Sequence, residues 1–177
     1  MISENFIVDK LKSTDANQLC QFMFDNYERL KYYFPKTLSS NSTLEKTSKY
    51  ILTKNKEIEE KTNFTFAIRE KTFQNIIGLI IIKKIDWNKK QAEFAYCIGS
   101  EYEGKGLTSL AVNEIVKFSF EDLELKTLQI VVYKTNLASI KVALNNNFIW
   151  QQTLKNEFIP TNEAPLDMEL YELKNEK

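Results

Sequence analysis

The sequence contains no histidine among its 177 residues. A Ser-His-Asp triad and a Cys-His dyad both need a histidine as the base, so this chain alone can form neither. A zinc centre with histidine ligands is excluded for the same reason. If the protein is an enzyme, its chemistry must come from carboxylates, hydroxyls, backbone donors or a bound cofactor.

Cysteine is also scarce, since the only two are Cys20 and Cys97. They form neither a CxxC pair nor a disulfide framework, and we expect no metal site. The N-terminus lacks a basic segment followed by an apolar one, which argues against a secretory signal. The longest strongly apolar run, residues 76–82, is too short to cross a bilayer as a helix. We therefore expect a cytoplasmic protein with no membrane partner.

An excess of one charge is absent as well, because 24 Lys and Arg residues balance 24 Asp and Glu residues. Nucleic-acid-binding domains are typically strongly basic, so we expect no nucleic-acid partner. The hydrophobic fraction of 43% is typical of a globular chain. The length suits a single domain spanning residues 1–177.

The pattern of apolar residues predicts a mixed α/β domain built on one central sheet. Strands are expected at residues 4–12, 63–70, 75–85, 91–99, 126–133, 148–158 and 165–173. Helices are expected at residues 13–30, 43–60, 105–122 and 136–147, with a loop at 31–42 that is either irregular throughout or helical at its start. Ser13 or Thr14 should cap the first helix, and Asn136 the last.

Glycine is rare, yet two of the four glycines are Gly104 and Gly106, between a predicted strand and a predicted helix. The first turn of a helix has unpaired N–H groups and a partial positive charge. Glycines let an anion approach such a turn without meeting a Cβ, and the hydroxyl of Thr108 would add a donor. The pattern indicates a phosphate site, although a short glycine motif is also compatible with a tight turn that binds nothing.

The segment AEFAYCIGSEYEGKGLTSLAV, residues 92–112, resembles the GNAT N-acetyltransferases. It is most similar to the subgroup that acetylates ribosomal-protein N-termini and polyamines. The Q/R-x-x-G-x-G/A motif of the family reads here as residues 101–106, and residues 136–148 are similar to the subgroup's N-x-x-S…G-F segment. The resemblance implies a GNAT-type sheet of about seven mostly antiparallel strands, splayed between strands four and five, with about four helices.

The resemblance also implies that acetyl-CoA is the co-substrate. Backbone N–H groups of the glycine loop would hold its pyrophosphate, and the edge of the fourth strand would bond to its pantetheine arm. The cofactor-binding residues implied in this way are Tyr96, Cys97, Ile98, Glu103, Gly104, Lys105, Gly106, Leu107, Thr108, Asn136 and Ser139.

Three residues depart from the family pattern. Glu101 replaces the commoner Arg or Gln of the motif. Asn147 replaces a glycine before Phe148, where asparagine can still adopt the left-handed conformation. Ala143 stands where many members carry a tyrosine that protonates the departing thiolate, so no tyrosine can act as the acid at that position.

Acetyl transfer to an amine by direct attack needs a base for the amine and donors for the oxyanion. The resemblance places Glu93 as the general base. The alternative is an outward-facing glutamate that pairs with Lys83 or Lys84. Ser139 is the candidate acid, or simply an ordinary residue of a helix's first turn, and Cys97 is expected to be a buried strand residue rather than a nucleophile.

The acceptor is expected to be a primary amine, with a protein N-terminus first and a small molecule such as a polyamine second. Tyr32, Tyr33 and Phe34 either wall the acceptor pocket or belong to the core. The expected function is acetyl-CoA-dependent N-acetyl transfer. A non-catalytic CoA-binding or regulatory domain with the same fold is the alternative, and a monomer and a homodimer are both open.

Overall fold

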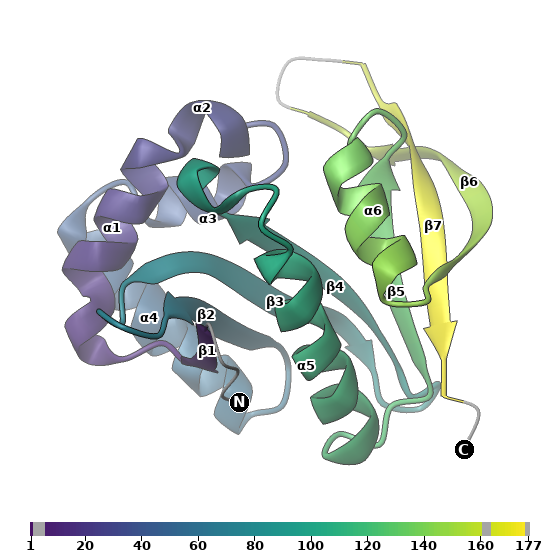
Figure 1. Cartoon of the computed structure of the whole chain (residues 1–177), viewed down its shortest axis with the longest axis horizontal. Coiled ribbons are helices and arrows are strands. Elements are labelled where there is room, and N and C mark those ends of the chain that lie inside the picture. Colours follow the sequence, from purple (N-terminus) through teal and green to yellow (C-terminus); the bar gives the residue numbers. More distant parts are fainter. Residues whose placement is uncertain (2–5, 161–163, 176–177) are drawn as a thin grey trace. The chain divides into compact units, whose positions relative to one another are not determined.

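The computed structural model describes residues 1, 6–160 and 164–175 (Figure 1). Residues 4 and 5 of the predicted first strand lie outside the described residues. The strands are β1 (Phe6–Lys10), β2 (Phe64–Glu70), β3 (Ile76–Asp86), β4 (Gln91–Ile98), β5 (Thr127–Tyr133), β6 (Ile149–Phe158) and β7 (Leu166–Lys174). The α-helices are α1 (Ala16–Asp25), α2 (Tyr27–Leu30), α3 (Pro35–Ser40), α4 (Leu44–Glu59), α5 (Leu107–Glu121) and α6 (Leu137–Asn145).

The seven strands form one mixed sheet in the order β1-β2-β3-β4-β5-β7-β6, which confirms the predicted α/β fold. β5 pairs with β4 in parallel and with β7 in an antiparallel ladder. A parallel pair needs a crossover connection, which α5 supplies here. The parallel ladder joins Gln91–Phe94 to Thr127–Ile130, while β4 continues to Ile98. The ladder thus joins only the first half of each strand, as the expected splay requires.

The described chain divides into two compact units. The first lies within residues 1–81 and 96–107, and the second within residues 82–95 and 108–177. β3 and β4 therefore contribute residues to both units.

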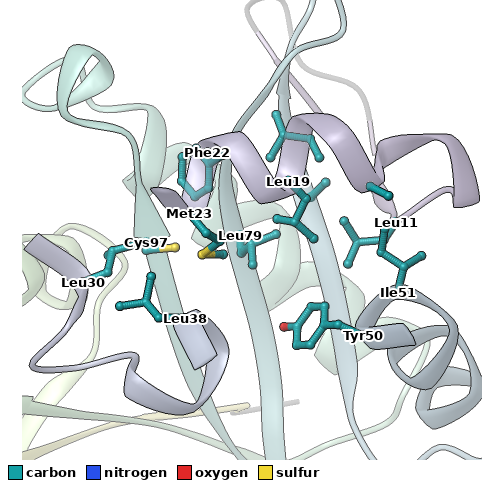
Figure 2. Packing of buried hydrophobic residues seen from close by; sticks show 13 residues of the cluster. Leu11, Leu19, Phe22, Met23, Leu30, Leu38, Tyr50, Ile51, Leu79 and Cys97 are labelled. Carbon is teal, nitrogen blue, oxygen red and sulfur yellow. The ribbon is translucent and has the colours of Figure 1, made fainter. Parts of the chain in front are cut away.

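The first unit has a core between its helices and strands. Apolar residues of α1 recur at helical spacing, and Leu19 and Met23 are almost fully buried. Figure 2 shows these side chains turned toward Leu79 of β3 and Cys97 of β4. Burying side chains of this size contributes about 1.5–3 kcal/mol each, so this cluster holds α1 against the strands.

The second unit is held together by α5, α6 and β5. Alternate residues of β5 are buried, as expected for a strand with one face in the core. α5 buries an apolar stripe, and the rings of Phe94 and Phe148 lie 6.2 Å apart. Asn147 has φ of 61°, which confirms the left-handed conformation expected there. Asn136 caps α6 as predicted, because its Oδ1 accepts from the N–H of Ser139 at 3.1 Å.

Two predictions about the N-terminal helices were wrong. The segment 31–42 is not a loop, since it contains the helix α3, which begins at Pro35 in the first position where proline is favoured. The first predicted helix is broken into the 3-10 helix η1 (Ser13–Asp15), α1 and α2, so the described residues form six α-helices where about four were expected.

The predicted N-cap was also wrong, since Asp15 and neither Ser13 nor Thr14 precedes α1. The carboxylate of Asp15 accepts from the backbone N–H of Lys12 at 2.6 Å. It also pairs with Arg69, whose side chain is only 2% exposed. A buried guanidinium needs a counter-charge, and this need fixes the start of the helix.

No helix in the described part of the chain is long and apolar enough to cross a membrane.

Candidate functional site

The glycine loop precedes α5 and follows the 3-10 helix η2 (Ser100–Tyr102). Gly104 and Gly106 have φ of 71° and 74°, the left-handed region that side chains rarely adopt. A Cβ built at either glycine would meet no atom within 4 Å. Backbone conformation, rather than packing, therefore explains the two glycines, and the space above both is open.

The start of α5 adds a positive potential to this loop. The first four N–H groups of a helix have no partner within the helix and carry part of its dipole. α5 is 15 residues long, and its first turn contains no acidic residue. Residues 103–106 are exposed, so the loop and the helix start can receive an anion from solvent.

A side chain distant in the sequence holds the loop. Arg29 of α2 forms an ion pair with the carboxylate of Glu103. Its guanidinium also donates to the carbonyl of Ile98 at 3.3 Å and to Oδ1 of Asn26 at 3.0 Å. These contacts could not be predicted from the sequence, because Arg29 and Glu103 are 74 residues apart and belong to no common motif.

The end of β4 carries the segment expected to bond to pantetheine. Cys97 is 6% exposed, and burial raises the pKa of its thiol to about 12. A thiol of this kind stays protonated near neutral pH, which agrees with a core residue rather than a nucleophile. A Cβ at Gly78 of β3 would lie 2.4 Å from the Cys97 carbonyl oxygen, so only glycine allows the two strands to approach here.

Glu93 lies in the second unit with its side chain 8% exposed. One carboxylate oxygen is 2.8 Å from Nζ of Lys83, and the other is 2.8 Å from Nζ of Lys84. Successive side chains of a regular strand point to opposite faces. Lys84 has φ of 51°, which breaks this alternation and brings both ammonium groups to one carboxylate. The lysine pairing considered from the sequence is present, but the glutamate is buried rather than outward-facing.

Lys84 also contacts a second carboxylate, since its Nζ lies 3.4 Å from Oε1 of Glu157. Burial opposes the charge of Lys84, but hydrogen bonding and attraction to Glu93 and Glu157 raise the pKa of its ammonium group. Lys84 therefore keeps its positive charge beside Glu93 at neutral pH. If Glu93 accepts a proton, the proton must go to a carboxylate oxygen that already contacts one of these two lysines.

The aromatic residues expected to wall an acceptor pocket lie between α2 and α3. Tyr32 and Tyr33 are 49% and 39% exposed, whereas Phe34 packs on the apolar core of the first unit. The core interpretation therefore applies to Phe34, and the two tyrosines present their rings to solvent.

The expected site residues are distributed over both units. The first unit contains Tyr32, Tyr33, Phe34, Tyr96, Cys97, Ile98, Glu103, Gly104, Lys105, Gly106 and Leu107. The second unit contains Glu93, Thr108, Asn136 and Ser139. Within the first unit the structure brings together the end of β4, the glycine loop and α2. Within the second, Asn136 and Ser139 meet at the first turn of α6.

Residues 5–149 match the family model described as "Acetyltransferase (GNAT) domain". An uncharacterized N-acetyltransferase, p20 of Bacillus licheniformis, is 26% identical over 173 residues, which cover 98% of this chain and 94% of the relative. A spermidine N(1)-acetyltransferase of Vibrio cholerae is 26% identical over 134 residues, covering 76% of this chain and 73% of the relative.

Solved structures show the same fold along the whole chain. The ribosomal-protein-S5-alanine acetyltransferase of Vibrio fischeri matches with a TM-score of 0.92 at 24% identity, covering 100% of this chain and 97% of that one. The microcin C7 self-immunity acetyltransferase, solved in complex with acetyl-CoA and AMP, matches with a TM-score of 0.86 at 20% identity, covering 98% and 94%.

Proposed function

The chain belongs to the GNAT acetyltransferase family, and from that premise we propose that it transfers the acetyl group of acetyl-CoA to a primary amine. The amine would attack the thioester directly in a ternary complex, which needs no enzyme nucleophile and suits a chain without histidine. The observation that carries this proposal is the open loop with two left-handed glycines at the start of α5.

The geometry of the loop supports the proposal that it binds the pyrophosphate of the co-substrate. Backbone N–H groups from Glu103 to Thr108 would face the phosphates where neither glycine has a Cβ. Lys105 is exposed and would add a positive charge from solvent. Tyr96, Cys97 and Ile98 lie beyond the end of the ladder between β4 and β5, which supports their proposed bonding to the pantetheine arm.

In the proposed mechanism Glu93 removes a proton from the acceptor amine, directly or through a water. The two lysines occupy both oxygens of its carboxylate. Glu93 can act as a base only if one lysine ammonium group moves away from its carboxylate, so that the amine or the water can contact that oxygen. The long, flexible side chain of Lys84, 60% exposed, is the one better able to move.

Ser139 is the proposed acid for the departing thiolate. It lies in the first turn of α6, where the helix dipole favours a negative charge nearby. The cap of that helix uses Oδ1 of Asn136, so a contact from Asn136 to the pantetheine amides would come from its Nδ2 group.

A protein N-terminus is the first acceptor to test, and a polyamine the second. Both are primary amines, and the named relatives include enzymes for each class. The exposed rings of Tyr32 and Tyr33 are proposed to contact the acceptor, because an amphipathic ring suits either an ammonium group or a peptide.

A non-catalytic CoA-binding domain remains the second candidate. Two observations favour it: the pairing of Glu93 with two lysines, and the fully buried Ala143 where a tyrosine acid is common in the family. Such a protein would bind acetyl-CoA without releasing CoA in the presence of any amine.

The test is a thermal-shift titration with acetyl-CoA, with free CoA and ATP as controls. A ligand at 100 times its dissociation constant stabilises a fold by roughly 2.7 kcal/mol, about 5–10 °C for a domain of this size. Stabilisation by acetyl-CoA and CoA but not by ATP is the expected result. CoA release would then be measured with an N-terminal peptide and with spermidine. No shift at millimolar acetyl-CoA would contradict the proposal.

A further inference from the structure

Arg29 connects three parts of the first unit. Its guanidinium pairs with the carboxylate of Glu103 in the glycine loop, and it donates to the carbonyl of Ile98 at the end of β4. It also donates to Oδ1 of Asn26, one turn earlier in the chain. One side chain of α2 thus holds both the loop proposed for the pyrophosphate and the strand end proposed for pantetheine.

Asn26 fixes the position of Arg29. It is 6% exposed, and its Nδ2 donates to the carbonyl of Phe22 at 2.9 Å. Its Oδ1 accepts from Arg29 and also from the backbone N–H of Ser100 at 3.1 Å. The guanidinium is therefore oriented by a buried amide that is itself bonded to α1 and to the residue that begins η2.

The ion pair with Glu103 contributes little to folding. The two side chains are 36% and 51% exposed, and exposed pairs of this kind have small effects on stability. Its effect on charge is larger, because Glu103 places a carboxylate inside a loop proposed to bind a pyrophosphate. Without Arg29, that carboxylate would repel the phosphates at short range.

We propose that Arg29 is a positioning residue for acetyl-CoA, and that it acts by neutralising the carboxylate of Glu103 in the glycine loop. This inference rests on the proposed acetyl-CoA site. The pair Arg29 and Glu103 brings no net charge to the loop. Arg29→Met leaves one negative charge there, Glu103→Gln leaves one positive charge, and the double variant restores zero.

This count of charges predicts an order of affinities for acetyl-CoA. Glu103→Gln should bind a few-fold more tightly than the wild type, because the freed guanidinium attracts the phosphates. Arg29→Met should bind roughly fivefold to tenfold more weakly. The double variant should lie near the wild type. Lys31→Met is the matched control, because it removes a positive charge from the same segment in an exposed pair with Glu28.

Isothermal titration calorimetry with acetyl-CoA, at low and at high salt, measures this order in the full-length protein. The differences should shrink at high salt, since exposed charges are screened. In the acetylation assay the loss in Arg29→Met should appear in the KM for acetyl-CoA and not in kcat. A residue that only supports the fold would lower the melting temperature without producing this ordering.

Three results would overturn the inference. One is an unchanged affinity in Arg29→Met, and another is a failure of Glu103→Gln to restore the affinity of that variant. The third is weaker or equal binding in Glu103→Gln alone, which keeps the test valid even where Arg29→Met does not fold. A wild type that binds no acetyl-CoA refutes the proposed function instead, and is seen before any variant is made.

Discussion

Replacing Gly104 by valine tests the glycine loop most directly. The φ of 71° is a region in which an L-residue costs about 1–2 kcal/mol, and a β-branched side chain costs more. The added Cβ meets no protein atom within 4 Å, so packing should add little to this backbone cost. The affinity for acetyl-CoA should fall more than the stability, because the side chain would occupy the space proposed for the pyrophosphate beside the backbone N–H groups.

The expected loss of affinity follows from the free energy of the hydrogen bonds that the variant would lose. A hydrogen bond to a charged group is worth about 1.5–3 kcal/mol, so each bond lost in Gly104→Val weakens acetyl-CoA binding by roughly 10- to 100-fold. Calorimetry measures the affinity, and urea unfolding measures the stability of the same sample.

Gly104→Asn is the matched control for this experiment. Asparagine tolerates the left-handed conformation but still carries a Cβ. It should therefore keep most of the stability and still lose affinity, which separates the effect of the Cβ from that of backbone strain. Normal binding of acetyl-CoA by Gly104→Val would refute the placement of the pyrophosphate at this loop.

Three further predictions test other parts of the molecule. Glu93→Gln should leave acetyl-CoA binding intact and lower kcat/KM, most at low pH where the amine is protonated; an unchanged pH–rate profile would remove Glu93 as the base. Asp15→Ala should cost about 3–5 kcal/mol in urea unfolding, because it leaves Arg69 buried with less counter-charge; Asp167→Ala, which breaks an exposed pair, is its control, and equal losses would contradict the argument. Burial raises the pKa of Cys97 to about 12, so the unfolded thiol ionises first and stability falls as pH rises above about 8.5. Between pH 8 and 10 the wild type should lose roughly 1–2 kcal/mol more than Cys97→Ala, and parallel pH profiles would contradict this.

Most strands and long helices could be predicted because the apolar pattern that determines each of them lies within the segment itself. The stripe of α5 and the alternation of β5 follow from the period of apolar residues in each segment. Asn136 and Asn147 were also predictable, since a cap and a left-handed helix end depend on one side chain and its neighbours.

The break in the first helix could not be predicted, because its cause lies elsewhere in the chain. Asp15 forms an ion pair with Arg69 of β2, which is 54 residues away in the sequence. Capping preferences favoured Ser13 or Thr14, but the need to neutralise a buried guanidinium overrode them. The helix α3 was missed for a different reason, since its short turn-rich sequence has no helical period long enough to detect.

The backbone conformation of the glycine loop could be predicted from the sequence, but the ion pairs around the candidate site residues could not. The two glycines before α5 indicated an anion site from sequence alone, because their conformation is a local property. The partners of Glu93 could be named only as possibilities, since a regular strand would have offered one lysine and not both. The left-handed conformation of Lys84 brings both lysines to Glu93. Lysine has no preference for this conformation, so the sequence did not indicate it.

Both carboxylates of the candidate site have cationic partners, one set in each unit. Glu103 pairs with Arg29, and Glu93 pairs with Lys83 and Lys84. Within each unit, the carboxylate is thus balanced by cations of that same unit. The zero net charge of the chain, which gave no indication of a ligand, is thus compatible with a site whose negative groups are neutralised one by one.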